Sequence, residues 1–412
     1  MTGAARTDTA DEETTMATFT GDTDFDVQLA RTLSAATRGC ADLGEALATA
    51  DRVVAGDLGS WAREWTATAD AVLAEGDASL AEDQTVSARR CYLRASEYYR
   101  QAFFYLREDL DGADLHAAYK AHVGAFRAAL PLLPGATEVM DLEAGDVVAR
   151  GYLLRPDGSG TRRPTILAPA GYDSTAEAGY VAAAVDALER GLNCLVFEGP
   201  GQGGVLYEHR RYLRPDFEAV LTPVVDWLLT RDGVDPDRLV LLGRSFAGYL
   251  APRGATGEHR LAALVCDPAQ YDLGAAARAR TGEETWRRLE RHDPTLEADL
   301  APMIAEPRQR NAFRSRMASH GLDALTDYLR EISRFTLVGR AEKITCPTLA
   351  LAGEGDFAGT GQLDVFAAAL RSPVTTHRFT RAEGAGGHCE GLGQDRFARV
   401  VHDWIAAVLS TR

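Results

Sequence analysis

The sequence predicts an α/β protein in which a helical N-terminal region precedes a mostly parallel, eight-stranded sheet with helices on both faces. Three observations predict this class. From Asp26 to about Leu130 the chain is rich in Ala, Leu, Arg and Glu, with few helix breakers. After Pro131, short apolar runs such as LVFE and LVLLG alternate with helical segments, which is typical of buried parallel strands. Between residues 271 and 344, helical sequence interrupts this alternation.

Composition narrows the possible functions. The 412 residues correspond to two or three folding units of about 150 residues each. The apolar fraction of 46% and the charged fraction of 25% are those of an ordinary globular protein. With 44 basic and 60 acidic residues, the formal net charge is −16, which repels nucleic acid and anionic membrane surfaces. We therefore expect neither nucleic acid nor a membrane as a partner.

Residues 1–24 are polar, acidic and rich in Thr, so the sequence predicts a disordered tail there. The N-terminus lacks the basic start and apolar stretch of a secretory signal, and no apolar run reaches 18 residues. The six cysteines show neither a C-x-x-C pair nor zinc-ligand spacing. A cytoplasmic protein with reduced, mostly buried cysteines and no bound metal is expected.

Residues 25–133 are predicted to form a helical N-terminal cap domain. Its clearest helix runs from about Asp83 to Leu106, where apolar residues recur every three or four positions and form one stripe. The simpler interpretation is packing inside a helical bundle. The alternative is that Tyr98 or Phe104 forms a wall of an aromatic substrate pocket.

A catalytic domain is predicted over residues 134–412, after the breakers Pro131, Pro134 and Gly135. Strands are expected at 137–142, 147–154, 165–168, 193–197, 239–242, 261–266, 348–352 and 374–379. Helices are expected at about 176–190, 217–230, 246–256, 362–370 and 396–409. Segment 271–344 is expected to be a helical cap insertion. The active site of such a sheet forms beyond the carboxyl ends of its strands.

The strongest local motif is LVLLG-R-S-F-A-G, in which Ser245 lies between a strand and a helix. A serine on such a tight turn raises its hydroxyl above the sheet, and small neighbours are needed because the turn is strained. Gly243 and Gly248 flank Ser245, and Ala247 stands where the last glycine of G-x-S-x-G is usual. We therefore expect Ser245 to be a nucleophile.

A serine nucleophile needs a histidine base, and the base needs an orienting carboxylate. In this fold the expected chain order is Ser, acid, His. Asp356 follows the strand TLALAG, and His388 lies in the glycine-rich loop EGAGGHCEG. Asp267 and Glu354 are competing acids, while the other eight histidines lie in or beside helices or within a strand. The predicted triad is Ser245, Asp356 and His388.

An oxyanion hole is also expected. One donor is the backbone N–H after the nucleophile, that of Phe246, and the second comes from the turn after an earlier strand. In APAGYDS, Gly171 lets the chain turn and Tyr172 can direct its amide inward. Pro169-Ala170 stands where His-Gly or Gly-Gly is frequent.

The segment FEGPGQGG, residues 197–204, contains a formal G-x-G-x-x-G. A dinucleotide site would require the first strand of the domain, a helix opening on the last glycine and a later acid, and none of these is well met. Glu198 ends the preceding strand and is expected at the edge of the cleft. It either tunes substrate or water, or is an ordinary solvated or ion-paired side chain.

Together these motifs, at residues 171–174, 199–203 and 243–248 with Asp356 and His388, resemble the α/β-hydrolase superfamily. More narrowly, the chain is similar to the branch that contains 2,6-dihydroxypseudooxynicotine hydrolase and the fungal heptaketide-shortening hydrolase. The resemblance implies that the N-terminal helices and the insertion cover the active site. It also implies esterase activity or cleavage of carbon–carbon bonds beside a carbonyl in aromatic or polyketide compounds. Asp173 and Arg244 belong to the same motifs and, with Glu198, are candidate substrate-contacting or supporting residues.

The sequence thus predicts a serine hydrolase that needs no cofactor and acts on a small molecule, and its large apolar helical region is compatible with a homodimer. Three alternatives remain. A cyclase or acyltransferase could use the same scaffold while excluding water. An oligopeptidase would share the catalytic domain, although a β-propeller usually accompanies it. A non-catalytic ligand-binding module would not need all three triad residues.

Overall fold

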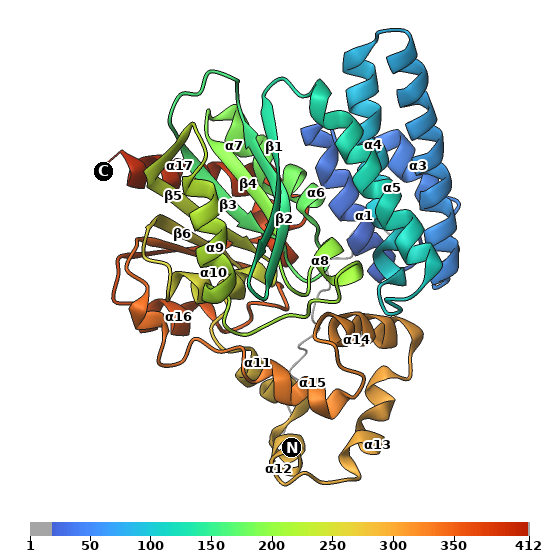
Figure 1. Cartoon of the computed structure of the whole chain (residues 1–412). Coiled ribbons are helices and arrows are strands. Elements are labelled where there is room, and N and C mark those ends of the chain that lie inside the picture. The colour runs from blue at the N-terminus through green and yellow to red at the C-terminus, as the bar shows by residue number, and fades with distance from the viewer. Residues whose placement is uncertain (1–18, 411–412) are drawn as a thin grey trace, which may run out of the picture.

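A twisted sheet of eight strands forms the centre of the protein, in the order β1-β2-β4-β3-β5-β6-β7-β8 (Figure 1). The computed structural model describes residues 19–410. Only the pairs β1–β2 and β2–β4 are antiparallel. The strands are β1 Ala136–Ala144, β2 Val147–Arg155, β3 Arg163–Pro169, β4 Asn193–Glu198, β5 Val234–Arg244, β6 Leu261–Asp267, β7 Thr348–Gly353 and β8 Val374–Phe379. The predicted fold class and all eight predicted strands are confirmed.

Helices cover both faces of the sheet, because successive side chains of a buried strand point to opposite sides. On β4, Phe197 packs toward α9 and α10, whereas Val196 packs toward α6, α7, α17 and the N-terminal helices. These helices are α6 Ala176–Gly179, α7 Val185–Glu189, α9 Glu218–Leu229, α10 Ala247–Ala255, α16 Leu363–Ala369 and α17 Gln394–Leu409. The single helix predicted over 176–190 is interrupted by a π-helical turn at Tyr180–Ala184.

The N-terminal helices pack against one edge of the sheet (Figure 1). They are α1 Thr23–Ala35, α2 Leu43–Ala50, α3 Leu58–Ala81, α4 Thr85–Phe103 and α5 Ala113–Ala129. Asp22 begins α1 by accepting hydrogen bonds from the amides of Asp24 and Phe25, so the predicted tail boundary at residue 24 falls inside this helix. Residues 1–18 of that predicted tail lie outside the described residues.

The apolar stripe predicted around α4 is buried between α3 and α5. Tyr98 is fully buried and its hydroxyl donates to Glu45 at 2.7 Å, so it is a packing residue. Phe104, in contrast, lines the main cavity of the protein. The packing interpretation therefore holds for Tyr98, whereas Phe104, just after α4, lies on the wall of a cavity.

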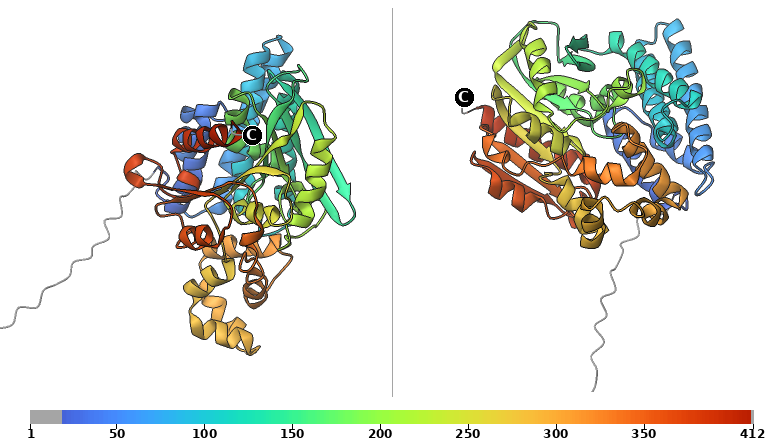
Figure 2. Two further views of the ribbon diagram at one scale, coloured as in Figure 1. Left: turned by 90° about the vertical axis from the view of Figure 1, so that its left-hand side faces the viewer. Right: turned by 60° about the horizontal axis from the view of Figure 1, so that its bottom comes forward.

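The insertion between β6 and β7 forms five helices that project beyond one end of the sheet (Figures 1 and 2). They are α11 Leu273–Thr281, α12 Glu283–Glu290, α13 Leu296–Leu300, α14 Pro307–Ser319 and α15 Leu325–Ile332. Helix α14 reaches the N-terminal helices, since Asn311 donates to the carbonyl of Tyr105 and Arg308 pairs with Asp22. The insertion and the N-terminal region therefore meet above the carboxyl ends of the strands.

Within residues 19–410, no helix is long and apolar enough to cross a membrane. In the same range, no group of three or more His, Cys, Asp or Glu side chains is arranged to hold a metal ion. All six cysteines are free, and five of them are buried, as predicted.

We predict that Trp61→Ala destabilises the protein by about 3–5 kcal/mol, because it removes a large, fully buried ring. Trp61 packs against Phe25, Trp65 and Tyr105, and its indole N–H donates to the carbonyl of Gln101 at 2.8 Å. Urea unfolding measures the change. The exposed Val54→Ala should change stability by less than about 0.5 kcal/mol; equal effects of the two substitutions would contradict the prediction.

Candidate active site

Ser245 occupies the turn between β5 and α10 with φ of 57°, a left-handed conformation that is rare for a residue with a side chain. Hydrogen bonds fix both sides of this peptide unit. Its N–H donates to the carbonyl of Asp267 at 2.7 Å, and its carbonyl accepts from the Gln270 side chain at 2.6 Å. The strained turn is therefore held by β6 and the loop that follows it.

The two glycines that flank the turn are required by close backbone contacts. A Cβ at Gly243 would lie 2.0 Å from the carbonyl oxygen of Ala247, and one at Gly248 would lie 2.1 Å from that of Pro268. Ala247 itself is fully buried at the first position of α10. An alanine at position 247 is thus compatible with the turn. On this side of Ser245, the position that must be glycine is 248, one residue later, because its backbone lies against the Pro268 carbonyl.

The structure brings the three predicted triad residues together. Ser245 Oγ lies 2.8 Å from His388 Nε2, and His388 Nδ1 lies 2.9 Å from Asp356 Oδ1. The three residues follow β5, β7 and β8, whose carboxyl ends meet at one edge of the sheet. Burial opposes a charge on the His388 ring, but Cys389 and Asp356 outweigh it, so its pKa lies well above the usual value.

The competing acids make other contacts. Asp267 Oδ2 accepts from Arg244 Nε at 3.0 Å, and Glu354 accepts from the backbone N–H of Arg381. Asp356 is therefore the carboxylate hydrogen-bonded to His388. Its Oδ1 also accepts from the N–H of Ala358 at 2.8 Å, which fixes the carboxylate.

Arg244 connects the nucleophile strand to the loop that carries His388. Its guanidinium donates to Asp267, to Gln394 and to the carbonyl of Cys389, and lies 4.0 Å from the ring centre of Phe397. These contacts hold the loop that carries His388 against β5 and β6.

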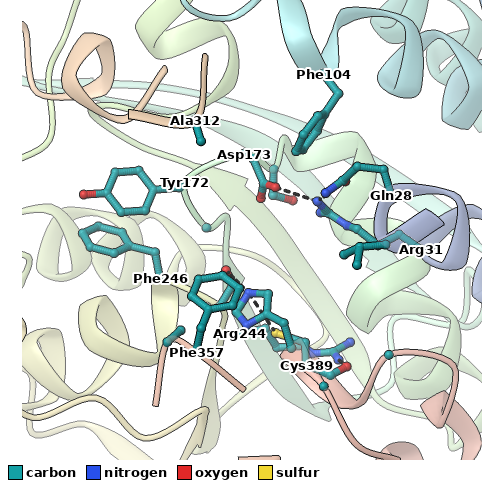
Figure 3. Close-up of a pocket in the computed structure, with 18 of the residues that line it drawn as sticks. Gln28, Arg31, Phe104, Tyr172, Asp173, Arg244, Phe246, Ala312, Phe357 and Cys389 are labelled. Atoms are coloured by element: carbon teal, nitrogen blue, oxygen red, sulfur yellow. Dashed lines mark hydrogen bonds and ion pairs between the residues drawn. The ribbon is translucent and has the colours of Figure 1, made fainter. Parts of the chain in front are cut away.

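The turn at Gly171 passes directly beside Ser245. A Cβ at this glycine would lie 3.2 Å from Ser245 Cβ, so a side chain here would press on the Ser245 turn and require it to shift slightly. Tyr172 follows, and its ring packs on Phe246 at 3.9 Å between centroids (Figure 3). Among the described residues, neither the Tyr172 nor the Phe246 amide N–H has a hydrogen-bond acceptor. Both predicted oxyanion donors therefore lie on turns next to Ser245.

A cavity of about 1150 Å³ opens onto Ser245 and His388. One side is aromatic, with Tyr172 and Phe246, while Asp173 and Arg31 lie on the side of the N-terminal helices (Figure 3). Arg31 Nη1 is 2.6 Å from Asp173 Oδ2, an ion pair between α1 and the loop after β3. Burial would raise the pKa of Asp173, but Arg31 and neighbouring arginines hold it below its usual range, so the carboxylate is charged.

Glu198 is buried rather than solvated, which rules out the simpler expectation for it. Its carboxylate accepts from the backbone N–H groups of Ala176, Gly204 and Val205. Contrary to the sequence-based expectation, a short helix, α8 Gly203–Tyr207, does open within the glycine motif. The Glu198 carboxylate occupies its N-terminus, where a dinucleotide would place its phosphates. Burial and the nearby Glu177 raise the pKa of Glu198 to about 8.

Four contributors were not predicted. Arg31 and Gln28 come from α1, and Cys389 lies beside His388 with its Sγ 3.8 Å from Nε2. His320 of the insertion is hydrogen-bonded to the Tyr172 hydroxyl. Because burial lowers the pKa of His320 to about 3, its ring is neutral in this contact. Of these residues, only Cys389 could have been found from the sequence, because it follows His388 in the same glycine-rich loop.

Comparison with known proteins gives the family. Hydrolase acrC of Aspergillus aculeatus is 31% identical over 388 residues, which cover 88% of this chain and 90% of the relative. Hydrolase LUC6 of a Fusarium species is also 31% identical, with 82% and 84% covered. The 20-hydroxy-prefusarin hydrolase FUS2 of Gibberella moniliformis is 33% identical over 58% of this chain and 59% of its own length. No family model matches the chain.

Among solved structures, the crystal structure of 2,6-dihydroxy-pseudo-oxynicotine hydrolase superimposes with a TM-score of 0.71, at 21% identity, over 92% of this chain and 95% of that one. This likeness shows the α/β-hydrolase fold, including the helical N-terminal region. The chain therefore belongs to the α/β-hydrolase family and is a hydrolase. The resemblance drawn from the sequence motifs is confirmed.

Gly248→Ala should destabilise the protein by about 1–3 kcal/mol and lower its activity, because the new methyl group meets the backbone carbonyl of Pro268. Gly124→Ala is the matched control. Gly124 lies in α5 with open space around it, so alanine should stabilise that helix by about 0.5–1 kcal/mol. Thermal unfolding compares the two. A Gly248→Ala protein as stable and active as its parent would refute the steric argument.

Proposed function

We propose that the protein is a serine hydrolase that acts on a carbonyl of an aromatic or polyketide-like small molecule and cleaves an ester or a carbon–carbon bond. The observation that carries the proposal is the continuous hydrogen-bonded chain from Ser245 through His388 to Asp356, at 2.8 and 2.9 Å. A base within this distance of a serine hydroxyl, oriented by a carboxylate, is what a serine nucleophile requires.

In the proposed reaction, His388 removes the Ser245 proton as Oγ attacks the substrate carbonyl. The N–H groups of Phe246 and Tyr172 stabilise the tetrahedral oxyanion. Collapse breaks the bond to an alcohol oxygen, or to a carbon that leaves as an enolate, and His388 returns the proton to the leaving group. His388 then deprotonates water, which releases the acyl group as a carboxylic acid and restores Ser245.

The cavity supports a sizeable, partly aromatic substrate. Its volume of about 1150 Å³ exceeds that of most small-molecule pockets, and Phe104, Tyr172, Phe246 and Phe357 line it. The likeness to a 20-hydroxy-prefusarin hydrolase, and in fold to a 2,6-dihydroxy-pseudo-oxynicotine hydrolase, favours natural-product compounds over peptides.

Intact-protein mass spectrometry after incubation with aryl esters and β-diketones tests the proposal. We expect an acyl adduct on the parent and none on Ser245→Ala. Ser174→Ala, which removes another serine that lines the cavity, should still form the adduct. Labelling of Ser245→Ala equal to that of the parent would refute the assigned nucleophile. Failure of the product acid to take up oxygen from labelled water would instead indicate a cyclase or acyltransferase.

Reaction with a fluorophosphonate probe should accelerate as pH rises, because His388 accepts a proton only when neutral. Since its pKa is raised, the midpoint should lie above the value of about 6.5 for a free histidine. Asp356→Asn removes a charge that favours the imidazolium, so the midpoint should move to lower pH while the rate falls by about 10³- to 10⁴-fold. An unshifted midpoint would show that Asp356 does not act on His388.

A further inference from the structure

The charges around the cavity differ from those of the whole chain. The protein carries a formal net charge of −16, yet nine arginines and only four Asp or Glu residues line the cavity within the described range. Five of the nine arginines pair with a carboxylate, among them Arg31 with Asp173 and Arg100 with Glu97. For the other four, residues 19–410 provide no carboxylate within ion-pair distance.

Arg107 is the most buried of these four, at 8% exposure. It follows the end of α4, and its Nε donates to the carbonyl of Phe104 at 2.7 Å while its guanidinium lies 4.4 Å from the centre of the Phe104 ring. Asp173 is nearby but is already bonded to Arg31. Three buried or half-buried guanidiniums, those of Arg31, Arg100 and Arg107, thus share two carboxylates, and one positive charge remains.

The insertion adds two more positive charges to the same cavity. Arg316, on α14, is half-buried, and no hydrogen bond or ion pair joins it to another residue of the described chain; Arg280 lies at the end of α11. Burial lowers the pKa of Arg107; Tyr207 and Asp173 raise it in part, whereas Arg31 and Arg316 lower it. Burial and Arg316 also lower the pKa of Arg280. The insertion therefore places like charges opposite each other across the cavity, where an anion would relieve their repulsion.

We infer that Arg107 and Arg316, assisted by Arg280, bind a carboxylate of the substrate, so that this hydrolase selects acidic compounds. The inference rests on the proposed function, since the carboxylate is a second group of the molecule whose carbonyl Ser245 attacks. A guanidinium suits a carboxylate because its N–H groups form two parallel hydrogen bonds to the two oxygens. The apolar body of the substrate would lie between this site and the aromatic wall of Tyr172 and Phe246.

The two arginines come from the two segments that cover the sheet, the N-terminal helices and the insertion. A carboxylate held between them would draw these segments together over the substrate. Binding energy from a group remote from the scissile bond would thus help to orient the carbonyl at Ser245 and exclude water.

Matched ester pairs test the inference. The 4-nitrophenyl monoesters of dicarboxylic acids from glutaric to sebacic acid carry a free carboxylate at increasing distance, and their methyl 4-nitrophenyl diesters are neutral. At the best chain length we expect kcat/KM to favour the acid over its methyl ester by about tenfold or more. Arg316→Gln should reduce this ratio by about tenfold, mainly through KM. Because Arg107 is buried and its variant could misfold, Arg316 is the primary target.

Arg314→Gln is the matched control, since Arg314 lies on the same helix, is exposed and makes no ion pair within the described chain. It should leave the ratio of kcat/KM for acid over methyl ester unchanged.

Calorimetry with Ser245→Ala provides a readout without turnover, and the monoester should bind more tightly than its methyl ester. Equal kcat/KM for acid and methyl ester at every length, or equal loss in Arg314→Gln and Arg316→Gln, would overturn the anion site while leaving the hydrolase intact. Absence of any Ser245-dependent turnover would instead refute the proposed function.

Discussion

The strained backbone at Ser245 is the constraint on which the arrangement of the site depends. A non-glycine residue in the left-handed region costs of order 1–3 kcal/mol and persists only when its surroundings fix it. Here the Asp267 carbonyl and the Gln270 side chain hold the two sides of the turn. Gly171 lies close enough that a Cβ would contact Ser245. Ser245, the proposed nucleophile, is therefore positioned by tertiary contacts from the ends of β3 and β6, not by its own segment.

Arg244 extends this control to His388, the proposed base. Next to Ser245 in the chain, it donates to Asp267 on β6 and to the carbonyl of Cys389 in the loop that carries His388, so one buried charge joins the two halves of the site. Asp267 and Glu390 both lie within ion-pair distance of this guanidinium, and because burial raises the pKa of both carboxyls and repulsion by Asp267 raises that of Glu390 further, the two share the opposing negative charge. Asp267, which the sequence analysis considered as an alternative to Asp356, thus has a different role. It neutralises the arginine that links the loops.

Features set by local sequence could be predicted, whereas features set by contacts between distant segments of the chain could not. The strands were found because a buried parallel strand needs a short apolar run, and Ser245, Asp356 and His388 because each follows such a strand in a glycine-rich turn. The contact of His320 with Tyr172 and the pairing of Arg31 with Asp173 span 148 and 142 residues and depend on how separate helices dock. The burial of Glu198 arises likewise from the approach of α6 and α8, which no local pattern encodes.

The structure also separates the groups proposed to perform chemistry from the walls of the cavity. The proposed triad and the turns beside it lie at the carboxyl edge of the sheet, where β3, β5 and β7 fix them. The walls of the cavity come from the N-terminal helices and the insertion, which are joined to the sheet by contacts such as Arg31–Asp173 and Tyr172–His320. Both contacts end on the loop that carries Tyr172. A shift of either covering segment would therefore act directly on the turn of Tyr172, the proposed oxyanion donor, so the segments that form the cavity walls also bear on the atoms beside Ser245.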